Sequence, residues 1–284
     1  LENKSKRMDI IKTEMLEIKD LYGDERRTEI VPVDTDFSME DMIAEEEVVL
    51  TITHQGYIKR TALNTYRSQR RGGRGVQGAM SKDEDFVEHL FIANTHNYML
   101  FFTDTGKCYW LKVYDIPQAG RASRGRAIVN LIGCNPEEKV EAFVSVKDFD
   151  DDHYIVMATR NGIIKKTVLS AYGKPRKGGI YAIEIRDGDK LIQARVSNGE
   201  NDILLGTHEG KSIRFSENDV RASGRKTMGV KGITLSSKID YVVGMLLVKR
   251  EGTILVATEK GYGKRTEVLQ YRTQTRAGKG VLTM

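Results

Sequence analysis

One short pattern recurs five times along the chain, and it limits the possible folds more than any other feature. In each copy an apolar run leads to a small polar residue, then to a turn glycine and a basic strand end. The turn glycines lie 50, 56, 48 and 51 residues apart, at Gly56, Gly106, Gly162, Gly210 and Gly261. Alternating side chains around a short glycine turn are typical of a β-hairpin. The sequence therefore predicts five hairpins in a repeat architecture.

Further apolar stretches between the hairpins supply more strands, at residues 88–93, 139–146 and 241–248. About four strands in each repeat of roughly 50 residues is the composition of a propeller blade. We therefore predict an all-β, propeller-like fold of four-stranded blades over residues 48–284.

Residues 1–29 differ from the rest, because apolar side chains recur there every three or four residues, as on one face of a helix. These side chains are Met8, Ile11, Met15, Ile18 and Tyr22, and Gly23 follows as a candidate C-cap. The segment opens without a recognisable start signal. It is interpreted as the end of a longer helix whose partners lie upstream; the alternative is a helix packed on its own domain.

Residues 30–47 form an acidic segment that we expect to be a linker leading into the first strand. Seven carboxylates lie between Asp34 and Glu47, and no Lys or Arg occurs between Arg27 and Lys59. Such a run is usually solvated. An alternative is that it repels nucleic acid from one face of the domain.

A basic, glycine-rich loop follows each hairpin. The first loop, residues 69–75, has three arginines and three glycines in seven positions. Glycine lets the backbone approach a bulky partner, and arginine presents a fork of donors that matches a phosphate. The candidate residues for binding a polyanion are Gln69, Arg70, Arg71, Gly72, Gly73, Arg74, Gly75, Arg121, Arg124, Arg126, Lys174, Arg176, Lys177, Arg221, Arg225, Lys226, Lys231, Arg276 and Lys279.

Any one of these loops could be ordinary solvated surface charge. In a radial repeat, however, equivalent positions of successive blades lie on the same rim. Five such loops therefore predict a positive belt that contacts a polyanion at several points, although the net charge of the whole chain is only +5.

Residues 69–75 resemble the box Q-(K/R)-R-G-G-(R/K)-G that marks the C-terminal domain of the DNA gyrase A protein. The runs HQGYIKR, ANTHNYMLFF, GRAIVNL, ATRNGIIKKT and GYGKRT resemble the same domain, so the similarity covers residues 30–284. It implies a six-bladed β-pinwheel, of which the sequence shows five hairpin patterns, and a domain that wraps DNA so that the holoenzyme can introduce negative supercoils. It also implies the rest of the gyrase A protein and the gyrase B protein as partners, with ATP and magnesium bound elsewhere in the holoenzyme.

No catalytic or metal-binding arrangement is expected in this segment. The five histidines occur singly, and Cys108 and Cys134 lack metal-ligand spacing, so we interpret the cysteines as reduced core thiols. We expect neither a membrane span nor a signal peptide, because the sequence shows no long apolar run and no charged opening followed by an apolar segment. The family resemblance implies a bacterial, cytoplasmic, nucleoid-associated protein.

Two alternatives to the gyrase interpretation stay open. One is the matching domain of topoisomerase IV, in which the box is usually degraded or missing, so the intact residues 69–75 argue against it. The other is a propeller that binds protein partners and whose basic rim is incidental.

Overall fold

The computed structural model describes residues 3–29, 39–65, 85–120, 123–135 and 137–284. The chain divides into two compact units, Leu1–Met42 and Ile43–Met284, and each is described by itself.

The first unit contains the predicted helix, α1 (Lys4–Tyr22), and a short 3-10 turn, η1 (Met39–Met42). The expectation of a missing start signal is wrong, because the Asn3 side chain caps the helix by accepting a hydrogen bond of 3.0 Å from the Ser5 N–H. At the other end Gly23 donates its N–H to the Lys19 carbonyl over 2.7 Å. All side chains of α1 are exposed, including the apolar stripe.

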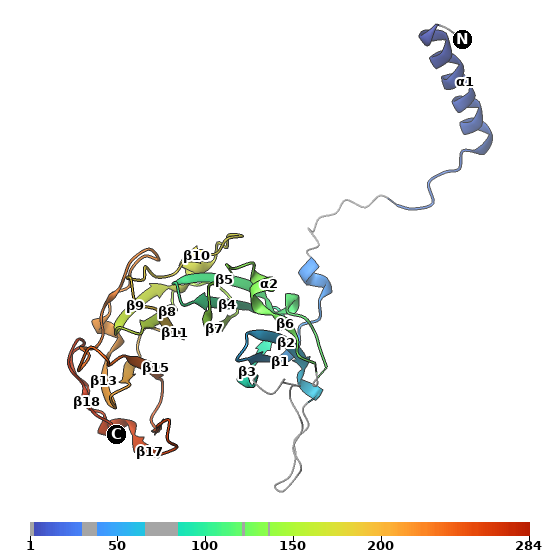
Figure 1. The fold of residues 1–284 in the computed structure, drawn as a ribbon. Coiled ribbons are helices and arrows are strands. Elements are labelled where there is room, and N and C mark those ends of the chain that lie inside the picture. Colours follow the sequence, from blue (N-terminus) through green and yellow to red (C-terminus); the bar gives the residue numbers. More distant parts are fainter. Residues whose placement is uncertain (1–2, 30–38, 66–84, 121–122, 136) are drawn as a thin grey trace. The chain divides into compact units, whose positions relative to one another are not determined.

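The second unit contains the five predicted hairpins (Figure 1). They are β1 (Glu47–Thr53) with β2 (Tyr57–Ala62), β4 (Tyr98–Thr103) with β5 (Lys107–Lys112), β8 (Tyr154–Thr159) with β9 (Ile163–Val168), β12 (Asp202–Thr207) with β13 (Lys211–Ser216), and β16 (Thr253–Ala257) with β17 (Gly263–Glu267). Each turn glycine has a positive φ between 75° and 84°, a conformation that glycine adopts without steric cost.

A third strand pairs antiparallel with the first strand of each of the first four hairpins. These strands are β3 (Val87–Asn94), β7 (Val140–Val146), β11 (Leu191–Ser197) and β15 (Val242–Val248). The stretches predicted from apolar runs correspond to β3, β7 and β15. The sequence reasoning does not single out β11, whose apolar residues alternate with Gln193, Arg195 and Ser197. Within the unit β11 contacts both β7 and β15.

The fourth strand of each sheet has two residues and comes from the next repeat of the sequence. These strands are β6 (Arg126–Ala127), β10 (Ile180–Tyr181), β14 (Val230–Lys231) and β18 (Val281–Leu282), and they pair with β2, β5, β9 and β13 respectively. The predicted number of four strands is confirmed for these four sheets, but each outer strand is exchanged between neighbouring repeats. Among the described residues β16 and β17 pair only with each other.

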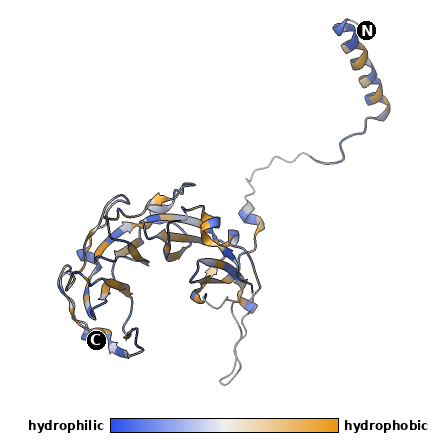
Figure 2. Cartoon of the chain, viewed as in Figure 1, coloured by the Kyte–Doolittle hydropathy of each residue, from blue (hydrophilic) through white to orange (hydrophobic). Residues whose placement is uncertain are grey.

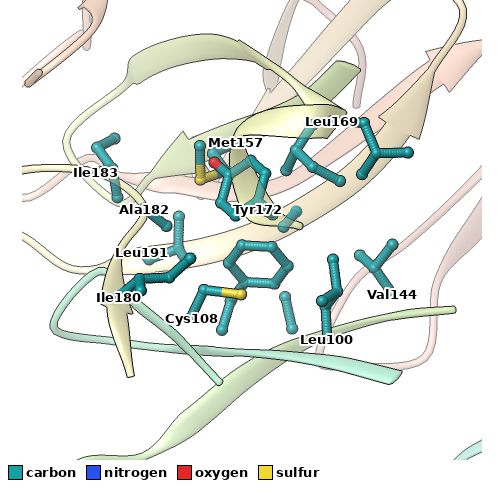
Figure 3. Packing of buried hydrophobic residues seen from close by; sticks show 14 of the residues in the cluster. Leu100, Cys108, Val144, Met157, Leu169, Tyr172, Ile180, Ala182, Ile183 and Leu191 are labelled. Atoms are coloured by element: carbon teal, nitrogen blue, oxygen red, sulfur yellow. The ribbon is translucent and has the colours of Figure 1, made fainter. Parts of the chain in front are cut away.

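Apolar side chains from consecutive sheets form shared cores. Figure 3 shows one of them, in which Leu100 and Cys108 of the second sheet face Met157 of the third, and Tyr172 closes the space between them. Two similar cores join the first sheet to the second and the third to the fourth. Figure 2 shows where the apolar residues of these cores come from: many residues of the strands are hydrophobic, whereas the connections are mostly hydrophilic.

A glycine with positive φ directly precedes each exchanged strand. These residues are Gly125, Gly179, Gly229 and Gly280, with φ between 71° and 87°. A Cβ atom on Gly229 would lie 2.6 Å from the Ile164 carbonyl oxygen, and one on Gly280 would lie 2.5 Å from that of Ser212. The chain therefore enters each outer strand through a position that only glycine fits without strain.

We predict that Gly229→Ala lowers the free energy of unfolding by about 1–3 kcal/mol, because the added methyl group meets backbone and the φ is unfavourable. Gly224→Ala in the same loop is the matched control, since its Cβ would meet nothing within 4 Å. Urea unfolding followed by circular dichroism measures both; equal losses in the two variants would contradict the prediction.

Candidate nucleic-acid interface

The described basic loops occupy equivalent places on successive sheets. We define loop 2 by its described residues 119–120 and 123–125, loop 3 as 174–179, loop 4 as 221–229 and loop 5 as 274–280. At or just before the start of loops 2, 4 and 5, the chain lies beside the second hairpin strand of the preceding repeat, through the parallel bridges Arg60↔Gln118, Lys166↔Ala222 and Arg214↔Thr273. All four loops end at a glycine that enters the exchanged strand of the preceding sheet.

Most of the predicted cations in these loops and in the strands that follow are exposed. They are Arg126, Lys174, Arg176, Lys177, Arg221, Lys226, Lys231 and Lys279. Loop 3 alone presents three of them within four residues, around Pro175. The four loops therefore place ammonium and guanidinium groups at the same edge of successive sheets, where they can contact the phosphates of a long polyanion.

Three other predicted cations are half-buried, and two of them make side-chain contacts within the protein. The Arg124 guanidinium stacks on the Tyr57 ring at 3.7 Å and donates to the Gln55 side chain. Arg276 donates to the carbonyls of Asp219 at 3.0 Å and Lys231 at 3.2 Å. These two arginines attach loops 2 and 5 to neighbouring backbone and side chains.

Arg225 is the third half-buried cation. Its backbone carbonyl accepts a hydrogen bond from Lys165, which fixes the middle of loop 4. The box residues Gln69, Arg70, Arg71, Gly72, Gly73, Arg74 and Gly75, and also Arg121, lie outside the residues that the structure describes.

Two fully buried lysines lie beneath loops 2 and 4, and the sequence reasoning does not identify their role. Lys59 of β2 donates to the carbonyls of Gly120 at 3.2 Å and Ser123 at 2.8 Å. Lys165 of β9 donates to those of Ala182 at 2.6 Å and Arg225 at 2.5 Å. Each lysine is only 1% exposed. In the sequence pattern the two lysines stand out only as members of the basic end of a hairpin strand.

The signal that could have found them lies in the alignment of the repeats. Both lysines come three residues after a turn glycine, and the second and fourth repeats have Tyr109 and Ile213 at that position. A position that accepts tyrosine and isoleucine in two repeats is expected to face a core in the first and third repeats too, whereas Lys264 at this position of the fifth repeat is exposed.

The next residue along the strand also binds backbone. Arg60 donates to the Ile116 carbonyl at 2.7 Å, Lys166 to that of Glu217 at 3.2 Å, and Arg214 to that of Val268 at 3.0 Å. Each carbonyl belongs to, or directly follows, the short 3-10 turn that leads to a basic loop. These cations of the hairpin strands therefore hold the chain that leads into the loops, whereas most of the described cations of the loops face solvent.

Burial changes the proton affinity of both lysines. Desolvation lowers the pKa of Lys59. Desolvation, followed by repulsion from Arg225, lowers the pKa of Lys165 from 10.5 to about 8, and Glu184 opposes that shift. Burial raises the pKa of the Cys108 thiol, with Arg225 acting in the opposite direction, and this thiol is therefore unreactive.

The described residues contain no group of three or more His, Cys, Asp or Glu side chains arranged to hold a metal ion. No helix in the described part of the chain combines the length and apolar character needed to cross a membrane.

The pKa of Lys165 predicts a pH dependence of stability. Between about pH 8 and pH 10.5 this lysine is protonated in the unfolded chain but largely deprotonated in the folded one. Because the unfolded state binds more protons in this window, the contribution of Lys165 makes the free energy of unfolding rise with pH. Lys165→Met removes that contribution. Urea unfolding at several pH values on both sides of pH 8 should show the wild type gaining stability relative to Lys165→Met, whereas the exposed Lys190→Met should run parallel to the wild type.

Comparison with known proteins gives a consistent result. The family model described as "DNA gyrase C-terminal domain, beta-propeller" matches residues 47–94, 97–147, 153–198, 201–249 and 252–284, and each of these segments contains one hairpin. The DNA gyrase A protein of Clostridium acetobutylicum is 50% identical over 283 residues, which cover 100% of this chain and 34% of that protein. The chain thus spans about a third of the length of the curated relatives it matches.

Two solved structures are similar to the chain. The C-terminal domain of DNA topoisomerase IV matches with a TM-score of 0.70 and 32% identity, covering 85% of this chain and 73% of that one. A DNA gyrase A C-terminal domain matches with a TM-score of 0.68 and 28% identity, covering 83% of this chain and 76% of that one.

Proposed function

The chain belongs to the DNA gyrase C-terminal domain family, and we propose that it binds duplex DNA along its basic loops and bends the DNA around them. The observation that carries the proposal is the recurrence of exposed cations at the same edge of successive sheets, in loops 2 to 5 and the strands that follow. One basic loop could be incidental. Recurrence at one structural position favours a partner that is itself long, regular and negatively charged.

Phosphate contacts supply the affinity. Each neutralised phosphate releases counterions, so the logarithm of the binding constant falls by about 0.9 per contact for each decade of salt. Two contacts from each of five loops would give a slope of roughly 9. Bending the duplex by about 40–90° costs on the order of 1–6 kcal/mol, which this many contacts can offset at moderate salt.

The binding is sequence-independent in this proposal. Recognition of base edges normally requires a helix or a β-ribbon in the major groove. The described loops 2 to 5 present flexible cationic side chains from irregular backbone, which suit phosphates rather than base edges. Proteins that wrap DNA through its backbone alone work in this way.

Within the whole enzyme, the domain wraps a DNA segment next to the cleavage site and presents it for strand passage. The wrap makes the ATP-dependent reaction introduce negative supercoils rather than only relax DNA. The partners are the rest of the gyrase A protein and the gyrase B protein. In this proposal ATP and magnesium bind elsewhere in the holoenzyme. The holoenzyme acts on the bacterial nucleoid in the cytoplasm. In this proposal Arg70, Arg71 and Arg74 clamp phosphates, while Gly72, Gly73 and Gly75 let the box lie flat on the duplex.

The equivalent domain of topoisomerase IV is a second candidate, favoured by the similarity to its solved C-terminal domain. The intact box at residues 69–75 and the 50% identity to a gyrase A protein support the gyrase assignment instead. A protein-binding propeller does not account for the recurring exposed cations.

Neutralising loop 3 tests the phosphate contacts. Replacing Lys174, Arg176 and Lys177 together by glutamine should weaken DNA binding and lower the salt slope by up to about 2.7, since each contact contributes about 0.9. Fluorescence anisotropy of a labelled duplex, titrated at several salt concentrations, gives both quantities.

A matched control removes the same charge from the opposite edge of the sheets. Lys190, Arg195 and Lys249 are exposed and lie on or next to β11 and β15. Their triple glutamine variant should keep the wild-type slope. Equal losses in the two triple variants, or a wild type with a flat salt dependence, would contradict DNA binding along the loops.

Replacing residues 69–75 by alanine tests the role of the box in the assembled enzyme. We predict that supercoiling is lost while relaxation persists, because the uptake of wrapped DNA sets the direction of strand passage. Linking numbers of nicked plasmid religated in the presence of the protein measure the wrap directly. Supercoiling that survives the replacement would show that the box is not the source of wrapping.

A further inference from the structure

We propose that Lys59 and Lys165 are positioning residues for DNA binding, each of which supports a basic loop from beneath by holding its backbone carbonyls. This inference rests on the proposed function, because the loops matter here as DNA contacts. The two lysines do not themselves touch the duplex in this proposal, since each is 1% exposed.

Loop 4 shows why such support is needed. It lies beside β9, and the two segments line an open pocket of about 400 Å³ whose walls include Lys165, Ser223, Thr227 and Gly229. The ends of the loop are held by backbone hydrogen bonds, from the Ser223 N–H to the Lys166 carbonyl at 2.9 Å and from the Glu184 N–H to the Thr227 carbonyl at 3.1 Å. Between these two points, the Lys165 ammonium adds a charged hydrogen bond to the Arg225 carbonyl.

Lys165 connects loop 4 to a second segment as well. Its ammonium bonds both the Arg225 carbonyl, in the middle of loop 4, and the Ala182 carbonyl, which follows β10 of the preceding sheet. Exposed Arg221 and Lys226 lie on either side of Arg225 along the loop. The position of these side chains thus depends on a bond made beneath them.

Lys59 supports loop 2 in a similar way, by donating hydrogen bonds to two backbone carbonyls. Its ammonium bonds the carbonyls of Gly120 and Ser123, which are three residues apart in the loop. Ser123 also donates its N–H to the Gly120 carbonyl over 3.0 Å, so this carbonyl accepts from both the ammonium and the backbone. Arg124 and Arg126 follow in the chain.

Loops 3 and 5 rest on apolar or aromatic side chains at the equivalent position. A Cβ on Gly179 would lie 2.8 Å from the Tyr109 ring, and one on Gly278 would lie 3.2 Å from the Ile213 side chain. Glycine lets these two loops sit directly on their supports. The supports of the described loops therefore alternate between lysine and an uncharged side chain, and only loops 2 and 4 of this described set depend on a buried ammonium.

This difference makes the inference testable loop by loop. Lys165→Met keeps an unbranched apolar stem of the same four-atom length, with a sulfur in place of one methylene, and removes the ammonium. We expect the amides of residues 221–229 to exchange with solvent at least about tenfold faster, while loops 2, 3 and 5 keep their wild-type rates. Lys59→Met should accelerate exchange in residues 119–125 and leave loop 4 unchanged. Native-state hydrogen exchange of the full chain, analysed by mass spectrometry, gives both patterns.

DNA binding supplies the second measurement. Each variant should bind a labelled duplex about three- to tenfold more weakly, with a salt slope lower by about 0.9 for each phosphate contact that its loop loses. The exposed Lys190→Met is the matched control, and it should change neither the exchange of the loops nor the binding. If Lys165→Met does not fold, Lys165→Ile replaces it, because the fourth repeat folds with Ile213 at that position.

The outcomes separate this inference from the proposed function. A wild type whose binding has no salt dependence overturns the proposed function and the inference with it. A salt-dependent wild type with variants that bind equally well, or whose exchange rises everywhere rather than in one loop, overturns the inference alone. Failure of both Lys165 variants to fold would also overturn it, since the lysine would then serve the whole fold rather than its loop.

Discussion

The exchange of a two-residue outer strand between neighbouring repeats is the constraint on which the rest of this structure depends. β6, β10, β14 and β18 each close a sheet whose other strands come from the preceding repeat. To reach that edge, the chain must run outward from its own hairpin, pass beside the preceding one and turn through a glycine of positive φ. The basic loops are the segments that make this passage. Their place at one edge of each of the four-stranded sheets follows from the connectivity.

Basic residues therefore have two different roles in one repeat. Those on the second hairpin strand, such as Lys59, Lys165 and Arg214, point into the protein and bind carbonyls of the passing chain. Those on the loops, such as Lys177 and Lys226, are exposed. A buried ammonium is tolerated only where it is well hydrogen-bonded, and the irregular backbone of the loops supplies those acceptors. The backbone carbonyls of the loops thus accept hydrogen bonds from the buried cations, while side chains of the same loops carry the exposed cations.

The sequence predicts the local elements well and their connections poorly. The hairpins can be recognised because alternation and a turn glycine are properties of neighbouring residues. The exchanged strands cannot, since two residues such as Val230 and Lys231 have no periodicity and find their partner in another repeat. The cap at Asn3 is missed, although its side chain is of a type that commonly begins helices. The predicted loop cations are mostly exposed, but composition alone cannot distinguish Arg126 from Arg124, whose guanidinium lies on the Tyr57 ring.

The exchanged strands also determine which pieces of the chain can fold alone. A fragment cut at the boundaries of a sequence repeat would lack its own outer strand and carry one that belongs to its neighbour. It would also lose half of each core that it shares with the adjacent sheets. Such a fragment exposes an unpaired sheet edge, which favours association with another chain. The repeats of this domain are thus units of sequence but not units of folding. A repeat can be added or removed only if the exchanged strand and the shared core on each side of it find new partners.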